Sequence, residues 1–218
     1  GANAAGTGVA LFTALGKLHA IVPDEADRAA LPFQDAAGRL AHWKAEIDRH
    51  RLRPEPVADA VWRWLSANIP PPSGPTVLVH GDFRSGNFLV DADNRLLAVL
   101  DWEMAHLGDA IEDLAWVMDP LWGHGMADVV AGTCPRDTAI AAWEAASGRS
   151  FDAAHWRWWE LFSAYQGLAI WITSAFEVAT QRTADPAILF AALHPYRFHN
   201  WHAAQLLKAA KQGEEARA

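Results

Sequence analysis

Four polar residues lie in a short stretch of this chain where a purely structural segment would not require them. Asp82 and Asn87 follow one apolar run, Asp101 comes directly after another, and Asp109 lies eight residues further on. Carboxylate and amide oxygens are ligands that Mg²⁺ accepts, and a free carboxylate can take a proton from a hydroxyl group. The residue types therefore indicate metal-assisted chemistry on a substrate hydroxyl.

A β-hairpin is predicted to bring two of these residues together. The apolar segments 88–90 and 96–100 flank the polar stretch 91–95, which is typical of two antiparallel strands and their turn. Position 94 is the midpoint between Asn87 and Asp101 and falls within that turn, so the two side chains are expected to be neighbours. An amide and a carboxylate at one end of a hairpin suit a Mg²⁺ that keeps several waters and holds a polyphosphate.

Asp82 lies five residues before Asn87 on the loop that leads into this hairpin. It would lie beside the ion without having to bind it. A carboxylate in that position can accept the proton of an attacking hydroxyl, which makes Asp82 the candidate general base.

The remaining pattern is mostly helical. Pro70 to Pro75 interrupts any helix and is followed by a strand candidate at 76–79. Asp109 is predicted to cap the next helix, with Glu112 as its capping-box partner. Apolar residues at helical spacing predict further helices over 7–21, 39–51, 57–68, 137–147, 152–178 and 194–211, with a loop over 122–135. We expect an α+β, mostly helical fold with a small β-hairpin that carries the metal site.

Composition excludes several classes of partner. The 218 residues carry a net charge of −8, so there is no surplus of positive charge to neutralise a nucleic acid backbone. No apolar stretch approaches the roughly 20 residues of a membrane-spanning helix. Cys134 is the single cysteine, which fits a reducing compartment. We therefore expect a cytoplasmic protein that binds neither nucleic acid nor membrane.

Three motifs carry a family resemblance. They are His80-Gly81-Asp82-Phe83-Arg84-Ser85-Gly86-Asn87, then Leu100-Asp101-Trp102-Glu103, then Leu107-Gly108-Asp109, with Asp113-Leu114-Ala115 close behind. In this order and spacing they resemble the C-terminal lobe of the aminoglycoside phosphotransferase and choline kinase family, which has the protein-kinase-like fold. Within that family, the sequences of the first two motifs are most similar to those of the phosphotransferase branch associated with acyl-CoA dehydrogenases.

The resemblance implies a role for each motif residue. Asp82 would be the catalytic base, and Asn87 and Asp101 would be the Mg²⁺ ligands. His80 would support the catalytic loop, and Asp109 would brace it through backbone hydrogen bonds. The implied reaction transfers a phosphoryl group from ATP to a hydroxyl of a small-molecule acceptor.

The start of the chain departs from the family pattern. Kinase-like enzymes cover the ATP phosphates with a glycine-rich hairpin and a strand lysine in a separate N-terminal lobe, and we expect that lobe to be absent here. We interpret residues 1–75 as a helical segment with a proline-rich linker, 76–118 as the catalytic and metal-binding part, and 119–218 as a helical acceptor-binding subdomain. The surface left open by the missing lobe would favour a homo-oligomer.

Aromatic residues in the second half indicate the acceptor. Most of the twelve tryptophans are expected in the core, but Trp122, Trp159 and Tyr165 are candidates to line a partly apolar acceptor site. Two alternatives to the enzyme remain. One is a catalytically silent binding module that lacks the N-terminal lobe, and the other is a metal-dependent hydrolase that uses Asp82, Asn87 and Asp101.

Overall fold

The computed structural model describes residues 2–126 and 128–215 and groups them into two compact units. Unit 1 consists of Gly1–Asp35 and Pro71–Trp156, and unit 2 of Ala36–Pro70 and Arg157–Ala218. Each is described by itself. The predicted division into three parts along the chain remains a prediction.

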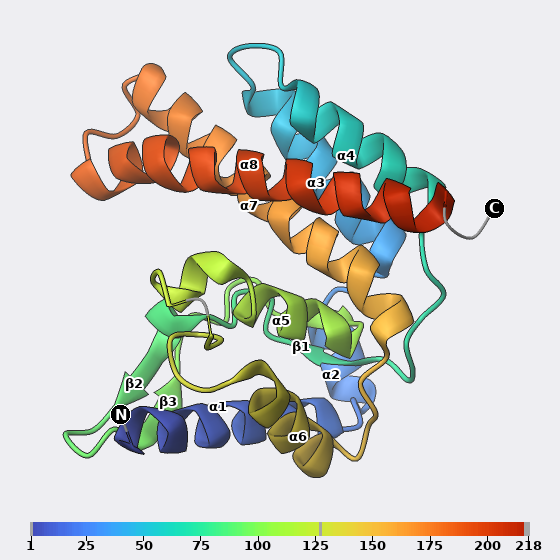
Figure 1. Ribbon diagram of the computed structural model, residues 1–218, viewed down its shortest axis with the longest axis vertical. Helices are drawn as coiled ribbons and strands as arrows, with labels where there is room; N and C mark the ends of the chain where they lie inside the picture. Colours follow the sequence, from blue (N-terminus) through green and yellow to red (C-terminus); the bar gives the residue numbers. More distant parts are fainter. Residues whose placement is uncertain (1, 127, 216–218) are drawn as a thin grey trace. The chain divides into compact units, whose positions relative to one another are not determined.

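Unit 1 contains all of the motif residues. It begins with the long helix α1 (Ala2–Ala20), which lies beside α6 in Figure 1 and contacts it extensively. Its other elements, in chain order, are α2 (Glu25–Ala30), β1 (Val77–Val79), the 3-10 turn η1 (Ser85–Asn87), β2 (Phe88–Val90), β3 (Leu96–Val99), β4 (His106–Gly108), α5 (Ala110–Val117), η2 (Pro120–Gly123) and α6 (Arg136–Ser147).

Two short antiparallel strand pairs position the motif loops. β2 and β3 form the predicted hairpin, with Phe88 opposite Val99 and Asn94 in the left-handed conformation of its turn. β1 pairs with β4 through Val77 opposite Gly108 and Val79 opposite His106. The loop after β1 and the loop before β4 therefore start from one strand pair, which places both beside the same end of a two-stranded sheet.

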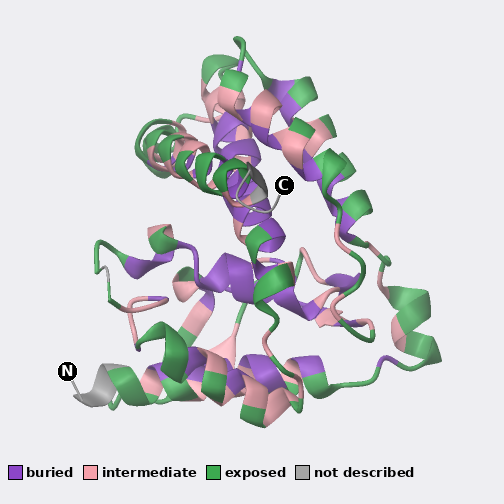
Figure 2. Ribbon diagram, turned by 45° about the vertical axis from the view of Figure 1, so that its right-hand side comes forward, coloured by how far each residue is buried: buried purple, intermediate pink, exposed green. Residues whose placement is uncertain are grey.

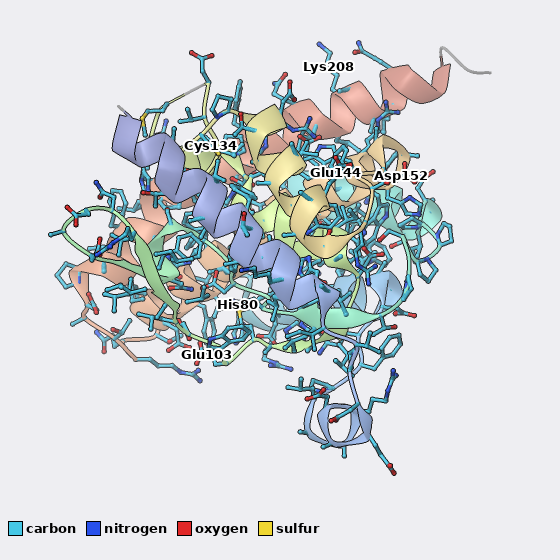
Figure 3. All side chains as sticks on the ribbon, turned by 90° about the horizontal axis from the view of Figure 1, so that it is seen from below. His80, Glu103, Cys134, Glu144, Asp152 and Lys208 are labelled. Atoms are coloured by element: carbon cyan, nitrogen blue, oxygen red, sulfur yellow. The ribbon has the colours of Figure 1, made fainter. Side chains whose placement is uncertain are left out.

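The core of unit 1 lies around α5, which is buried along its whole length (Figure 2). Leu11, Phe12 and Leu15 of α1 are fully buried as well. The single cysteine is also packed here. Cys134 lies against α1 (Figure 3), so close that a Cβ on Gly8 would be 2.6 Å from its sulfur.

Unit 2 is entirely helical in the residues that the structure describes. It consists of α3 (Ala36–His50), α4 (Pro56–Ala67), α7 (Ala153–Ala179, which starts in unit 1) and α8 (Pro186–Glu215). Its interior is aromatic, because Trp158, Trp159 and Phe162 pack on one another with ring centroids 4.9–5.3 Å apart. None of the described helices of the chain is both long and apolar enough to cross a membrane.

The predicted elements differ from the observed ones at several places. The first helix begins at Ala2 and not at residue 7. The helix predicted to start at 194 begins at Pro186, where Asp185 accepts the Ala187 N–H at 2.8 Å, and continues through Pro195. Proline suits the first turn of a helix, and tertiary packing tolerates the hydrogen bond lost at Pro195. Helix α2 and strand β4 were not predicted, since six and three residues are too short for a periodic pattern.

Gly81 is the glycine whose conformation this arrangement requires. Its φ is +82°, and a Cβ there would lie 2.5 Å from the Met104 carbonyl oxygen in the loop before β4. Gly148 shares the left-handed conformation, at +69°, but has open space around it. Gly81 is therefore required for two reasons, because its φ is positive and because the Met104 carbonyl leaves no room for a Cβ.

We predict that Gly81→Ala lowers the free energy of unfolding by more than Gly148→Ala does. The left-handed conformation alone costs an alanine about 1–2 kcal/mol at each site. At position 81 the contact with Met104 adds to that cost. Urea unfolding of both variants measures the difference, and equal losses would show that close approach at Gly81 is unimportant.

Candidate active site

The loop after β1 is fixed by a carboxylate that lies beneath it. Asp113 of α5 is fully buried and accepts the backbone N–H of His80 at 2.7 Å and that of Gly81 at 2.9 Å. These are charge-assisted hydrogen bonds to the first two residues of the motif loop, residues 80–87. Asp113 therefore sets the direction in which this loop leaves the sheet.

A buried histidine completes the surroundings of Asp113. The indole N–H of Trp143 donates to His19 Nδ1 at 2.9 Å, so the ring proton is on Nε2, which lies 3.2 Å from Asp113 Oδ2. Burial by itself would raise the pKa of the Asp113 carboxyl, but the hydrogen bonds from His19 and the His80 backbone outweigh it and hold this pKa below its usual range. Asp113 is thus held as an anion inside unit 1.

His80 connects the motif loop to the loop after β3. Its Nδ1 accepts the backbone N–H of Asp82 at 3.2 Å, and its Nε2 lies 3.0 Å from the carbonyl oxygen of Leu100. The ring proton therefore belongs on Nε2, where it can be donated to Leu100. One buried ring thus connects the backbone of Asp82 with that of Leu100, the residue before Asp101, and the supporting role of His80 stays a prediction. Figure 3 labels His80 below α1.

The carboxylate of Asp82 is held by three side chains. Trp116 Nε1 donates to Oδ1 at 2.7 Å, Asn87 Nδ2 donates to Oδ2 at 2.8 Å, and Arg84 Nε lies 3.0 Å from both oxygens. The Asp82 side chain is 14% exposed. It is therefore a fixed carboxylate, still in reach of solvent, at the start of the motif loop.

Asn87 and Asp101 are brought to the same end of the hairpin, as predicted. Leu100 N–H donates to the Asn87 carbonyl oxygen at 2.8 Å, so Asp101 is the residue directly after the partner of Asn87. Asp101 is exposed and has a φ of +67°, a conformation that is uncommon outside glycine and often marks functional sites.

The donor atoms at this end of the hairpin fit Mg²⁺. Asn87 uses its Nδ2 for hydrogen bonds to Asp82, which leaves its amide oxygen as an acceptor. No group of three or more His, Cys, Asp or Glu side chains that could hold a metal occurs among the described residues. One amide oxygen and one carboxylate suit an ion that keeps several waters, in contrast to zinc, which takes three or four protein ligands.

The role expected of Asp109 belongs to Asp113. Asp109 accepts the N–H of Ser73 at 2.8 Å, the hydroxyl of Ser73, and the N–H of Ile111 at 2.9 Å. It therefore caps α5 and ties the proline-rich segment to it, while Asp113, one helical turn later, receives the motif-loop N–H groups. The signal that could have identified Asp113 is a charged residue in a helix that is otherwise apolar enough to be buried.

Glu112 does not act as the predicted capping-box partner of Asp109. Its carboxylate lies 3.2 Å from His106 Nε2 and is buried with it. The carboxylate that follows the N-cap by three residues therefore pairs with the first residue of β4.

The three predicted acceptor residues are all buried. Trp122, in unit 1, stacks under the guanidinium of Arg84 at 5.1 Å, whereas Trp159 and Tyr165 lie in the aromatic core of unit 2. Within the described part of the chain, the polar atom of each ring has no hydrogen-bond partner. Their role in acceptor binding remains a prediction.

Comparison with known proteins identifies the family. A profile of the phosphotransferase enzyme family matches residues 2–171, well over half of the chain. The chain belongs to this family. Acyl-CoA dehydrogenase family member 11 of Gallus gallus is 35% identical over 79 residues, which are 36% of this chain and 10% of that protein. The match to this curated relative thus covers only a small part of its length.

Solved structures share the fold of this phosphotransferase-family chain. A candidate aminoglycoside phosphotransferase from Ralstonia eutropha superposes with a TM-score of 0.74 at 20% identity, covering 93% of this chain and 66% of the other. Spectinomycin phosphotransferase in complex with ADP and spectinomycin superposes with a TM-score of 0.54 at 15% identity, covering 92% and 65%. At these identities the likeness establishes the fold.

We predict that Asp113→Asn lowers the free energy of unfolding by about 3–5 kcal/mol, because an amide cannot replace the charge that the buried donors surround. Asp109→Asn, which changes a partly exposed cap, is expected to cost about 1 kcal/mol. Chemical denaturation of both variants measures the contrast, and similar losses would remove Asp113 from its anchoring role.

The same carboxylate predicts part of the pH dependence of stability. Because the pKa of Asp113 is lowered on folding, its contribution is complete above the unfolded value of about 3.9 and is lost as the pH falls below that value. Unfolding measured between pH 7 and pH 3 should therefore show a steeper loss for the wild type than for Asp113→Asn. Parallel curves would contradict the assignment.

Proposed function

We propose that this chain carries the catalytic half of an ATP-dependent phosphotransferase that phosphorylates a hydroxyl of a small molecule. The observation that carries the proposal is the Asp82 carboxylate held by Trp116 and Asn87 on a loop that Asp113 anchors. Membership of the phosphotransferase family supports the reaction class, and the related structure with bound ADP supports the donor.

In this reaction Asp82 receives the proton of the acceptor hydroxyl. The acceptor oxygen then forms a bond to the γ-phosphorus of ATP, and the bond between that phosphorus and the β,γ-bridging oxygen breaks to release ADP. The protein has little covalent chemistry to perform. Its contribution is to orient the hydroxyl and to fix the carboxylate, which a loop pinned by two backbone hydrogen bonds can do.

Asn87 and Asp101 would hold Mg²⁺ at the end of the hairpin. The ion would supply positive charge to offset the negative charge that develops during phosphoryl transfer. Asn87 has a second role that the structure makes visible, because its amide N–H group also holds Asp82. The base and the metal ligands are therefore linked through one side chain.

The acceptor that we propose is partly apolar. Unit 2 contains a cavity of about 360 Å³, lined mainly by Ile172, Ala175, Val178, Leu189, Leu193 and Tyr196. That size falls in the usual range for small-molecule sites. Trp122, Trp159 and Tyr165 are not among the residues that line this cavity, and their part in acceptor binding remains a prediction from the sequence. The second candidate function remains a binding module without catalysis, which would bind nucleotide or acceptor but show no turnover.

We predict that Asp82→Asn lowers phosphoryl transfer by about 10²–10⁴-fold while the protein stays folded, since the amide keeps the shape but cannot accept the proton. Release of ADP in the presence of a panel of small alcohols measures the loss. Asp93→Asn, an exposed carboxylate of the hairpin turn, is the matched control and should retain full activity. Equal activity of Asp82→Asn and the control would reject Asp82 as the base.

Asp101→Asn is predicted to remove metal-dependent nucleotide binding. Asparagine tolerates the left-handed conformation at this position, so the variant removes a charge without straining the backbone. Calorimetric titration with Mg·ADP, compared with ADP in the presence of a chelator, should show a Mg²⁺-dependent increase in affinity for the wild type alone. An undiminished Mg²⁺ effect in the variant would place the metal elsewhere.

A further inference from the structure

Arg84 lies at the centre of the candidate site, and none of the roles described so far accounts for it. Its Nε lies 3.0 Å from both oxygens of Asp82, and its guanidinium stacks on the ring of Trp122 at 5.1 Å. Trp122 in turn packs edge to face on Trp116, the residue that donates to Asp82. Arg84 thus rests on Trp122, which in turn packs against the tryptophan that donates to Asp82.

Three N–H groups surround the Asp82 carboxylate in this arrangement. Trp116 donates to Oδ1 and Asn87 to Oδ2, whereas the single Nε–H of Arg84 is shared between both oxygens. An N–H at equal distance from the two oxygens covers the acceptor positions between them. A substrate hydroxyl that is to give its proton to Asp82 from that side must first displace Arg84.

Arg84 is the donor best placed to leave. Trp116 is 2% exposed and lies within α5, and Asn87 is 6% exposed and also donates to the backbone carbonyl of Asp82. The Arg84 side chain is 29% exposed and ends a flexible stem. It also carries the positive charge that an anionic phosphoryl donor would attract.

We propose that Arg84 covers the base in the ligand-free protein and moves onto the phosphoryl donor when the donor binds. The donor itself would thus uncover Asp82 for the acceptor hydroxyl. Arg84 is in this sense a positioning residue for Asp82, and the inference rests on the proposed function. It extends that function by making proton acceptance depend on donor binding.

Gly86 provides a way to test the covered state without removing the charge. An ideal Cβ on Gly86 would lie 2.1 Å from Arg84 Nη1, so Gly86→Ala pushes the guanidinium from its present position. The atom to be displaced is the end of a flexible side chain, and the φ of Gly86 is not in the left-handed region. The variant should therefore fold normally.

The kinetic test compares Gly86→Ala with Arg84→Gln and Arg84→Lys in the intact protein, with release of ADP as the readout. Gly86→Ala should lower KM for Mg·ATP by about 2–5-fold with kcat retained, because the covered state no longer competes with donor binding. Arg84→Gln should raise KM about tenfold or more through the lost charge, and Arg84→Lys should recover part of it. If Arg84 only holds Asp82 in place, all three variants should instead lower kcat together. That result would overturn the proposal.

A spectroscopic test follows Arg84 directly. The Arg84 Nε–H resonance, assigned by its loss in Arg84→Lys, should be present in the free protein and should shift, together with the Trp122 indole signal, when the non-hydrolysable analogue Mg·AMP-PNP is added. Adenosine with Mg²⁺ should leave both unchanged. Binding of Mg·AMP-PNP with an unchanged Arg84 signal overturns this proposal alone. If the intact protein neither binds the analogue nor turns over ATP, the proposed function fails, and this inference fails with it.

Discussion

The arrangement of unit 1 depends on one buried anion. Asp113 is fully excluded from solvent, and yet the pKa of its carboxyl is held below the usual range. Hydrogen-bond donors of the protein must therefore take the place of water around it. They come from α1 through His19 and from the motif loop through two backbone N–H groups. Because an unpaired charge in this position would be costly, the packing of α1, the end of β1 and the start of the motif loop are fixed together. The stability of the fold and the placement of the motif loop that carries Asp82 thus share one interaction.

The loops around Asp113 are shaped by backbone conformations that most residues avoid. Gly81 turns with a positive φ against the Met104 carbonyl, and Asp101 has a positive φ directly after the hairpin. His80 holds both turns from a buried position by binding Asp82 N–H on one side and the Leu100 carbonyl on the other. Strain of this kind persists only where the surroundings determine it, and here the surroundings are the strand pairs and the buried imidazole. The backbone of the two loops is therefore fixed by the protein itself.

The sequence predicted those parts of the molecule that depend on local patterns. The β2–β3 hairpin follows from two apolar runs around a polar turn, and most helices follow from apolar spacing. The bracing role of Asp113 could not be read in that way, because Asp109 has the better local signal as a helix cap and only packing shows which carboxylate the motif loop reaches. The start of α8 differs from the prediction because here the local signal is misleading. Pro195 is locally a signal to stop a helix, and the tertiary structure overrides it.

A general base must meet two requirements that oppose each other. It has to be held in one place, which calls for hydrogen-bond donors around it, and it has to keep an acceptor site for the proton it takes. In this chain the donors differ in character. Trp116 and Asn87 are buried and neutral and fix the position of the Asp82 carboxylate, whereas Arg84 is charged and partly exposed. Only a donor of the second kind can be exchanged for a substrate group at low cost, because water and an incoming anion both compensate for its departure. In the proposed mechanism, the division between fixed and exchangeable donors is thus what allows one carboxylate to be both positioned and reactive.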